Sequence, residues 1–213
     1  MDRLPVFVRQ HIAGFRALLV FTVLCGLIYP ALMVGVSQLA FHKQANGSMV
    51  SFNGKTVGSS LLCQEFSDAK GNPLPQYFQP RPSAAADPTS KTDYGCNPLF
   101  SAASNLGPNN QDEVKAIKQR QQAIAAFDHV PVSQIPADAV TASGSGLDPG
   151  ISPQNAAIQV NRVAAARHLP VSEVQSLVAT YTQGRTLGFL GEPAVNVLKL
   201  NIALDQLSAK SGG

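Results

Sequence analysis

Residues 17–41 read ALLVFTVLCGLIYPALMVGVSQLAF, and this stretch decides how the chain is organised. No Asp, Glu, Lys, Arg or His occurs between Arg16 and His42. A helix rises about 1.5 Å per residue, so a helix of this length exceeds the roughly 30 Å hydrocarbon core of a bilayer. The stretch therefore predicts one helix that spans a membrane and has the lipid bilayer as its surroundings.

A proline near the middle of this stretch predicts a kink in the helix. A spanning helix tolerates proline when neighbouring groups satisfy the carbonyl that the proline leaves free. Polar and small side chains on the same helix favour packing against a second protein, with Thr22 and Ser37 facing it. The residues expected in the kink or in helix packing are Tyr29, Pro30, Gly26, Gly35, Thr22 and Ser37. The alternative is a lone anchor, since Ser and Thr can also hydrogen-bond to their own helix.

A cleaved secretory signal would also place an apolar run after basic residues. The apolar part of such a signal is about 7 to 15 residues long and ends at a small-residue cleavage site. Here the run is longer, and residues 38–40, QLA, are a poor cleavage site because a bulky amide occupies the first position. An uncleaved anchor is therefore favoured.

The distribution of basic residues predicts the orientation of this anchor. Arg3, Arg9 and Arg16 precede the span, whereas Lys43 and Lys55 follow it. Basic residues near a span favour the cytoplasmic side, so we expect the N-terminus in the cytoplasm and the rest outside it.

The chain then divides into a cytoplasmic tail at residues 1–16, a transmembrane helix at 17–41 and a periplasmic domain at 42–213. The third part has the length of one ordinary domain. A net charge of +3 over 213 residues and the lack of any run of five basic residues argue against a nucleic-acid partner.

Turn and strand signals come first in the predicted domain. Asn53-Gly54 lies between two short alternating segments and predicts a hairpin over residues 49–57. Residues 61–66 are predicted to form a second short strand or an extended run, and residues 139–142 a further short strand. Frequent proline and glycine predict little regular structure over 67–108, and a segment of this kind is usually functional or disordered. Its aromatic residues favour a packed, functional segment.

Four helices are predicted in the remainder. They cover residues 111–128 after an Asn110 cap, 153–167 after a Ser152 cap, a segment from a capping box at Ser172 to Gly184, and 193–207. In the second of these helices, Asn161 and Arg162 are expected to face outward. The fold class is therefore α+β: one N-terminal transmembrane helix followed by a single small periplasmic domain with short strands and about four helices.

The sequence contains no recognisable catalytic or metal-binding motif. Residues 143–150 are rich in glycine but lack the lysine of a phosphate loop, which favours a tight turn before a helix. No GxSxG surrounds a serine, and no CxxC, HExxH or HxxxH spacing occurs among the cysteines and histidines. We therefore expect no catalytic residue, no metal site and no directly bound cofactor.

Two cysteines follow the span in a compartment that permits oxidation. A disulfide between Cys63 and Cys96 would close a loop across the proline-rich segment. Two small buried cysteines without a bridge are the alternative, because sequence alone does not bring their Cα atoms together.

Two segments carry candidate contacts for assembly. Tyr77 and Phe78 precede Arg81, which either binds a partner's carboxylate or pairs within the domain. The second segment, residues 188–193, contains Phe189, Leu190 and Glu192 and forms either a buried corner or an exposed docking tip.

Seven runs resemble the C-subunit family of Kdp-type potassium-transporting ATPases. They are QANGS at 44–48, GSSLL at 58–62, YFQPRPSA at 77–84, SNLGP at 104–108, TASGSGLDPGISP at 141–153, QVNRVAAAR at 159–167 and GRTLGFLGEPAVNVLKLNIALD at 184–205. They occur in the family's order and cover nearly the whole chain. Ala102-Ala103 departs from the Gly-Gly pair usual in the family.

This resemblance implies a noncatalytic subunit of a high-affinity, ATP-driven potassium uptake complex in the bacterial inner membrane. Its partners would be a channel-like potassium-translocating subunit and a P-type ATPase subunit, which handle potassium and ATP. The implied role is assembly and chaperone-like modulation of the ATPase subunit. From outside the membrane, any effect on ATP affinity would have to act through the membrane helices. The alternative function is a stand-alone membrane-anchored periplasmic enzyme or binding module.

Overall fold

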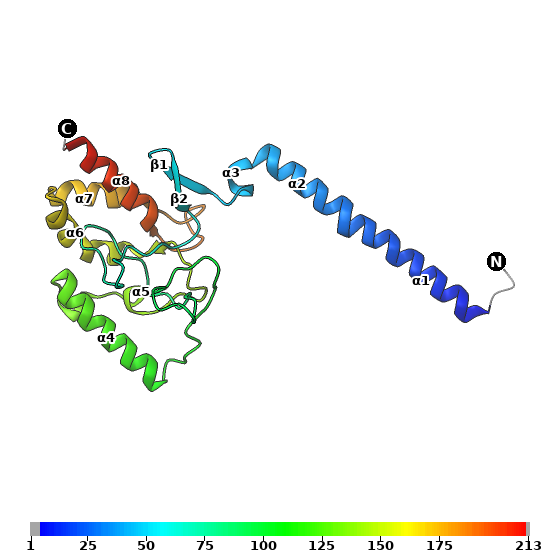
Figure 1. Ribbon diagram of the computed structural model, residues 1–213, viewed down its shortest axis with the longest axis horizontal. Coiled ribbons are helices and arrows are strands. Elements are labelled where there is room, and N and C mark those ends of the chain that lie inside the picture. Colours follow the sequence, from blue (N-terminus) through cyan, green and yellow to red (C-terminus); the bar gives the residue numbers. More distant parts are fainter. Residues whose placement is uncertain (1–4, 212–213) are drawn as a thin grey trace. The chain divides into compact units, whose positions relative to one another are not determined.

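The computed structural model describes residues 5–211, so Arg3 lies outside the described residues. The chain divides into two compact units, Met1–Ser48 and Met49–Gly213 (Figure 1). Each unit has its own fold, and the C-terminal unit contains all the strands found among the described residues.

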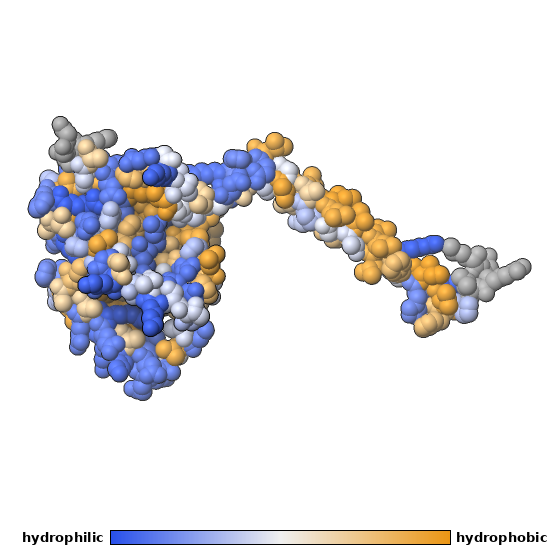
Figure 2. Space-filling model, in the orientation of Figure 1, coloured by the Kyte–Doolittle hydropathy of each residue, from blue (hydrophilic) through white to orange (hydrophobic). Residues whose placement is uncertain are grey.

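A nearly continuous helix makes up most of the N-terminal unit. It comprises α1 (Val6–Val23), the π-helical segment η1 (Leu24–Ile28) and α2 (Tyr29–Ala40), and the short helix α3 (His42–Ala45) follows. Within residues 5–211, Val6–Ala40 is the one helix long and apolar enough to cross a membrane, and apolar residues cover much of its surface (Figure 2). The helix starts before residue 17, so Arg9 and Arg16 belong to it.

The π-helical segment lies directly before the expected kink. The Tyr29 N–H donates to the Leu24 carbonyl, five residues earlier instead of four. Pro30 then stands in the first turn of α2. A π turn is one of the irregularities that bend helices.

The C-terminal unit begins with the predicted hairpin. Strand β1 (Met49–Phe52) pairs antiparallel with β2 (Lys55–Ser59). Asn53 and Gly54 have φ angles of 49° and 77°, as expected for the tight turn that this residue pair favours. The prediction is confirmed, and the second strand continues to Ser59, past the glycine at position 58.

Residues 60–110 contain no helix and no strand, only an isolated bridge between Ser67 and Pro73. The scarcity of regular structure predicted for 67–108 is confirmed, and of the two alternatives for residues 61–66, a short strand is not present. Single backbone bonds hold this run, such as the one from the Cys63 N–H to the Leu147 carbonyl at 3.0 Å. A strand needs a row of such bonds to one neighbour.

Long helices form most of the remaining chain: α4 (Gln111–Asp128), α6 (Pro153–Arg167), α7 (Val171–Thr180) and α8 (Val197–Ser211). Two predicted caps are present. Asn110 accepts from the Asp112 N–H at 2.8 Å, and Ser152 accepts from the Asn155 N–H at 3.0 Å. Both side chains satisfy N–H groups that a helix start leaves free.

Three predictions about the helical part of the chain, made from local sequence patterns, are wrong. The segment suggested as a strand at 139–142 instead includes the end of α5 (Ala137–Val140), which follows the short 3₁₀ segment η2 (Val132–Gln134). The capping box at Ser172 is wrong, because α7 starts after Pro170, without a side-chain cap. The last helix starts at Val197 because the residues before it form a strand.

That strand, β5 (Ala194–Asn196), is the centre of a three-stranded antiparallel sheet. Its neighbours are β3 (Gly150–Ile151) and β4 (Thr182–Gln183), in the order β3-β5-β4. Val195 lies opposite Ile151 on one side and Thr182 on the other. The sheet therefore joins the start of α6, the end of α7 and the start of α8.

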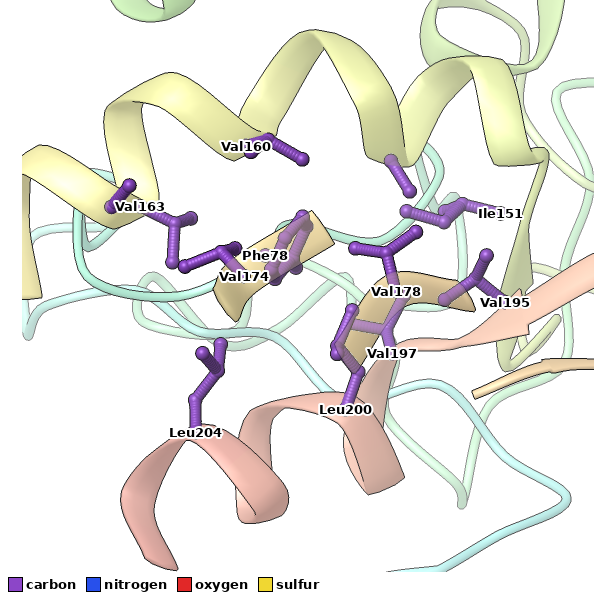
Figure 3. Packing of buried hydrophobic residues seen from close by; sticks show 12 residues of the cluster. Phe78, Ile151, Val160, Val163, Val174, Val178, Val195, Val197, Leu200 and Leu204 are labelled. Carbon is purple, nitrogen blue, oxygen red and sulfur yellow. The ribbon is translucent and has the colours of Figure 1, made fainter. Parts of the chain in front are cut away.

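The hydrophobic core lies between α6, α7, α8 and this sheet (Figure 3). Its largest fully buried side chains include Phe78, Ile151, Val163, Leu200 and Leu204. Burying each of these stabilises the fold by roughly 1.5–3 kcal/mol. Phe78 comes from the irregular segment, which is therefore part of the packed domain. The α+β fold class is confirmed.

Candidate functional site

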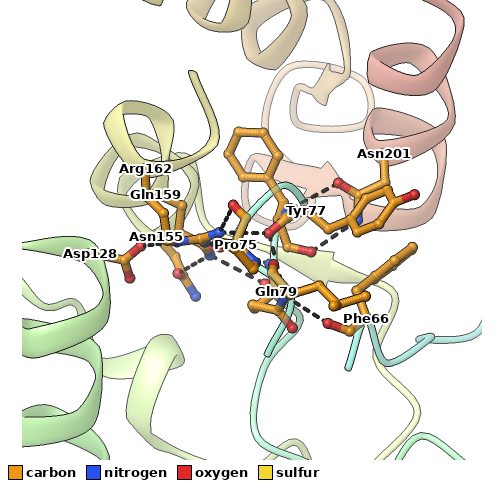
Figure 4. Close-up of polar contacts among 11 residues, drawn as sticks. Phe66, Pro75, Tyr77, Gln79, Asp128, Asn155, Gln159, Arg162 and Asn201 are labelled. Atoms are coloured by element: carbon orange, nitrogen blue, oxygen red, sulfur yellow. Dashed lines mark hydrogen bonds and ion pairs between the residues drawn. The ribbon is translucent and has the colours of Figure 1, made fainter. Parts of the chain in front are cut away.

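Residues 75–79, PQYFQ, run through the C-terminal unit with their backbone bound by side chains (Figure 4). Asn201 accepts from the Phe78 N–H at 2.9 Å and donates to the Phe78 carbonyl at 2.9 Å. Gln159 makes the same two bonds with Gln79, at 2.7 and 3.2 Å. Two side-chain amides thus supply the bonds that a neighbouring strand would supply elsewhere.

Arg162 connects this segment to α4. Its Nη1 donates to the carbonyls of Pro75 and Tyr77, at 2.6 and 2.9 Å, and its Nε donates to Asp128 at 2.7 Å. Arg162 and Asp128 are both buried. The prediction that Arg162 faces outward is therefore wrong, because the irregular segment leaves carbonyls that its guanidinium satisfies.

Arg167 binds the same segment at the last turn of α6. Its Nε donates to the Gln76 carbonyl at 2.6 Å, and its Nη2 donates to Asp205 at 2.7 Å. The Tyr77 hydroxyl donates to the other oxygen of Asp205 at 3.3 Å. Partial burial and the Asp205 charge raise the pKa of Tyr77. We refer to Gln159, Arg162, Arg167 and Asn201 as the clamp residues.

A cavity of about 440 Å³ adjoins residues 79–83. One face of α4 lines it with Arg120, Ile124 and Phe127, and α6 contributes Asn155 and Gln159. Cavities of this size are typical of small-molecule sites.

The loop side of the cavity contains Glu65, Ser67 and Tyr94. Ser67 donates a hydrogen bond to Glu65. Burial and, secondly, the nearby charge of Asp93 raise the pKa of the Glu65 carboxyl. The site around Glu65 therefore disfavours a negative charge.

Arg81 lies at the cavity with an internal partner. It forms an ion pair with Asp148 at 3.0 Å, and its Nη2 donates to the Thr141 carbonyl at 3.4 Å. Its Nε is buried and has no hydrogen-bond partner, the one such side-chain atom found over the described part of the chain. Internal pairing, one of the two alternatives for this residue, is therefore present.

A disulfide joins Cys63 and Cys96, whose Cα atoms are 5.4 Å apart. Glu65 lies two residues after the first cysteine, and Tyr94 lies two residues before the second. The bridge thus connects the two loop segments that bring these side chains to the cavity.

A second surface feature is the loop between β4 and β5. Thr186 and Leu190 exchange backbone hydrogen bonds, each at 2.9 Å, and Arg185 binds both oxygens of Glu192 at 2.9 and 2.7 Å. Three apolar side chains at the end of this loop are exposed by 50% or more: Leu187, Phe189 and Leu190. We refer to these three residues as the apolar tip. Of the two alternatives for residues 188–193, the exposed tip is the one present.

The candidate assembly residues thus fall into two groups. Tyr77, Phe78 and Arg81 lie on or just after the clamped segment, whereas Phe189, Leu190 and Glu192 belong to the loop of the apolar tip. Phe78 has 0% exposure, so its side chain packs in the core and presents no surface to a partner.

The clamp residues were not identified from the sequence. The spacing on α6 could have indicated that two of them are buried. Gln159 and Arg162 lie three residues apart, and each directly precedes a buried valine, Val160 or Val163. Polar side chains on the buried face of a helix must have buried partners. The partners lie in a proline-rich segment far away in the sequence, and the spacing on the helix does not identify them.

The candidate membrane-packing residues lie on the N-terminal helix. Thr22 and Gly26 are neighbours one turn apart, and a Cβ at Gly26 would lie 4.0 Å from the Thr22 methyl group. A Cβ at Gly35 would meet nothing within 4 Å. In the part of the chain that the structure describes, no three His, Cys, Asp or Glu side chains form a group that suits a metal ion.

Comparison with known proteins gives one consistent result. The sequence profile described as KdpC, the K⁺-transporting ATPase c chain, matches residues 11–206. The chain is 50% identical over 196 residues to the Potassium-transporting ATPase KdpC subunit of Kineococcus radiotolerans. The aligned region covers 92% of this chain and 93% of the relative. The subunits of the same name from Streptomyces avermitilis and Mycobacterium bovis are 47% and 45% identical, covering 93% of this chain and 94% and 99% of theirs. With its apolar N-terminal helix and α+β domain, this chain belongs to the KdpC family, the c chains of K⁺-transporting ATPases.

Proposed function

We propose that this chain is a noncatalytic subunit of a high-affinity, ATP-driven potassium uptake complex, needed for its assembly. Its helix Val6–Ala40 anchors it in the bacterial inner membrane, and its C-terminal unit docks on partner subunits. The partners are a channel-like potassium-translocating subunit and a P-type ATPase subunit. Family membership supports a complex of this kind.

The observation that carries the docking role is the apolar tip. Leu187 and Phe189 are 79% and 68% exposed, although the loop that bears them is held by a single backbone bridge and by the Arg185–Glu192 ion pair. Exposed apolar side chains on an ordered loop cost solvation free energy unless a partner covers them. Bound to a partner, the same side chains provide the well-packed anchors of an interface.

Two observations support a periplasmic C-terminal unit. Arg9 and Arg16 lie near the N-terminal end of the helix, on the side that the distribution of basic residues assigns to the cytoplasm. The Cys63–Cys96 disulfide suits an oxidising compartment. A C-terminal alkaline phosphatase fusion should be active. An inactive fusion beside an active cytoplasmic reporter at the same position would reverse the orientation.

In this proposal ATP and potassium are handled by the partner subunits. Any effect of this chain on ATP affinity is a coupling free energy carried by the membrane helices to the ATPase subunit. The purified chain should bind no labelled ATP in equilibrium dialysis, whereas the assembled complex should. Binding by the chain alone would contradict this part of the proposal.

The assembly role is tested by co-purification from detergent-solubilised membranes. The tagged full-length chain should capture two large polytopic subunits in stoichiometric amounts, and Phe189→Asp or Leu187→Asp should reduce the capture. Leu99→Asp is the matched control, because Leu99 is 85% exposed on the same unit but lies outside the apolar tip. Equal capture by all three variants would exclude the tip as the docking surface. A monodisperse single-span protein without partners would favour a stand-alone module.

A further inference from the structure

The cavity beside residues 79–83 has a carboxylate on its loop side that no cation neutralises. Glu65 forms no ion pair with any of the residues described, whereas Asp128, the other acidic residue of the lining, is paired with Arg162. Its one side-chain hydrogen bond comes from the neutral Ser67 hydroxyl. A half-buried carboxylate of this kind is stabilised by a positively charged ligand group.

Tyr94 contributes an aromatic ring to the same cavity lining. Tyr94 packs on Gly71, where an added Cβ would lie 2.7 Å from the ring. Only glycine therefore permits this position of the ring. A carboxylate and an aromatic face together form a site that suits an organic ammonium group.

Guanidinium groups line other parts of the same cavity. Arg81 is engaged by Asp148 and by the Thr141 carbonyl, and its unpartnered Nε is buried, so a ligand in the cavity does not reach that atom. Arg120 donates its Nη1 to the Val140 carbonyl, but its nearest carboxylate oxygen, on Glu113, is 3.9 Å away. The Arg120 guanidinium thus retains donor capacity at the cavity, and a ligand carboxylate is the acceptor that fits it best.

Apolar side chains complete the lining. Ile124 and Phe127 on α4 and Pro80 and Pro82 on the irregular segment belong to it. A ligand with charged groups at its two ends and methylene groups between them would leave no polar atom against this apolar surface.

We propose that this cavity binds a small organic zwitterion, with its ammonium group at Glu65 and its carboxylate at Arg120. The site is independent of the apolar tip and of assembly, so failure of either proposal leaves the other standing. The disulfide between Cys63 and Cys96 holds the loop segments that carry Glu65 and Tyr94.

The test uses a set of ω-amino acids with identical end groups and increasing length: glycine, β-alanine, γ-aminobutyrate and ε-aminocaproate. Each is titrated by isothermal calorimetry into the purified full-length chain in detergent. We expect saturable binding that is strongest at one length, because the two charged ends must reach fixed groups. n-Hexylamine and n-hexanoate, each with one of the two ends, should bind roughly tenfold more weakly or worse than the best zwitterion.

Single substitutions test which residues bind the zwitterion. Glu65→Gln keeps the shape of the side chain and should weaken the best zwitterion by roughly tenfold or more. Arg120→Gln removes the guanidinium charge and should also weaken it. Glu192→Gln, on the separate loop of the apolar tip, is the matched control and should bind as the unaltered chain does.

Three results would overturn the proposal. They are the absence of saturable binding at every length, equal binding of n-hexylamine and ε-aminocaproate, and unchanged affinity in Glu65→Gln. Circular dichroism of each variant distinguishes a lost contact from a lost fold. Because calorimetry uses the chain without partner subunits, its result does not depend on whether the co-purification experiment succeeds.

Discussion

Asn201 on α8 binds both backbone groups of Phe78, accepting from its N–H and donating to its carbonyl, each at 2.9 Å. Both residues are almost completely buried, with 1% and 0% exposure. The amide side chain therefore does for a single residue what a neighbouring strand does for a whole segment. It also places the Phe78 ring in the core.

Replacing Asn201 by Ala should destabilise the C-terminal unit by about 3 kcal/mol, because two buried backbone groups lose their partners. Urea denaturation of the full-length chain in detergent, followed by far-ultraviolet circular dichroism, measures this change. Asn161→Ala, at an exposed position of α6, should cost less than about 0.5 kcal/mol. Similar midpoints for the two variants would show that the Phe78 backbone does not need this amide.

The buried pair of Arg162 and Asp128 should behave as a coupled unit. Arg162→Met leaves an unpaired buried carboxylate and two unsatisfied carbonyls, and it should cost about 3–5 kcal/mol. Adding Asp128→Asn removes the unpaired charge and should restore part of that loss. The same denaturation assay gives the double-mutant cycle. Strictly additive effects of the two substitutions would contradict the coupling.

Loss of the disulfide should destabilise the unit, since the bridge spans a sequence separation of 33 residues. The chain-entropy estimate for such a loop is about 3–4 kcal/mol. Cys63→Ser combined with Cys96→Ser tests the loss by denaturation, with Cys25→Ser as the matched control. Maleimide labelling of the denatured, unreduced chain tests the bridge itself. Labelling of Cys25 alone is expected, and three reactive thiols would exclude the bridge.

Glu65 should make stability fall as pH rises. Burial and the Asp93 charge raise its pKa in the folded chain above the usual value of 4.5. Between 4.5 and that raised value the folded state binds more protons than the unfolded state, so the free energy of unfolding decreases with increasing pH. Glu65→Gln removes this dependence. Relative to the unaltered chain, it should gain stability as pH rises through that window.

Melting temperatures of both proteins from about pH 4 to about pH 7 test this prediction. Glu173→Gln, an exposed position on α7, is the matched control. A Glu65→Gln variant that loses stability relative to the unaltered chain as pH rises would show that the carboxylate is stabilising when ionised.

Several features of this protein follow from sequence alone because their causes are local. The apolar run at 17–41 is long enough to span a bilayer whatever surrounds it. Asn53-Gly54 adopts its turn because both residues tolerate positive φ. Asn110 and Ser152 mark helix starts because each side chain binds an N–H only two or three residues away. These interactions need no knowledge of the fold.

The features that only the tertiary structure decided depend on partners far away in the chain. Arg162 faces inward because the carbonyls of Pro75 and Tyr77 reach it from 87 and 85 residues away. Residues 194–196 form a strand because Ile151 and Thr182 lie on either side of Val195. Cys63 and Cys96 are joined because folding brings their Cα atoms within 5.4 Å. A local pattern records which groups need partners, but only the packing of distant segments determines which partners they find.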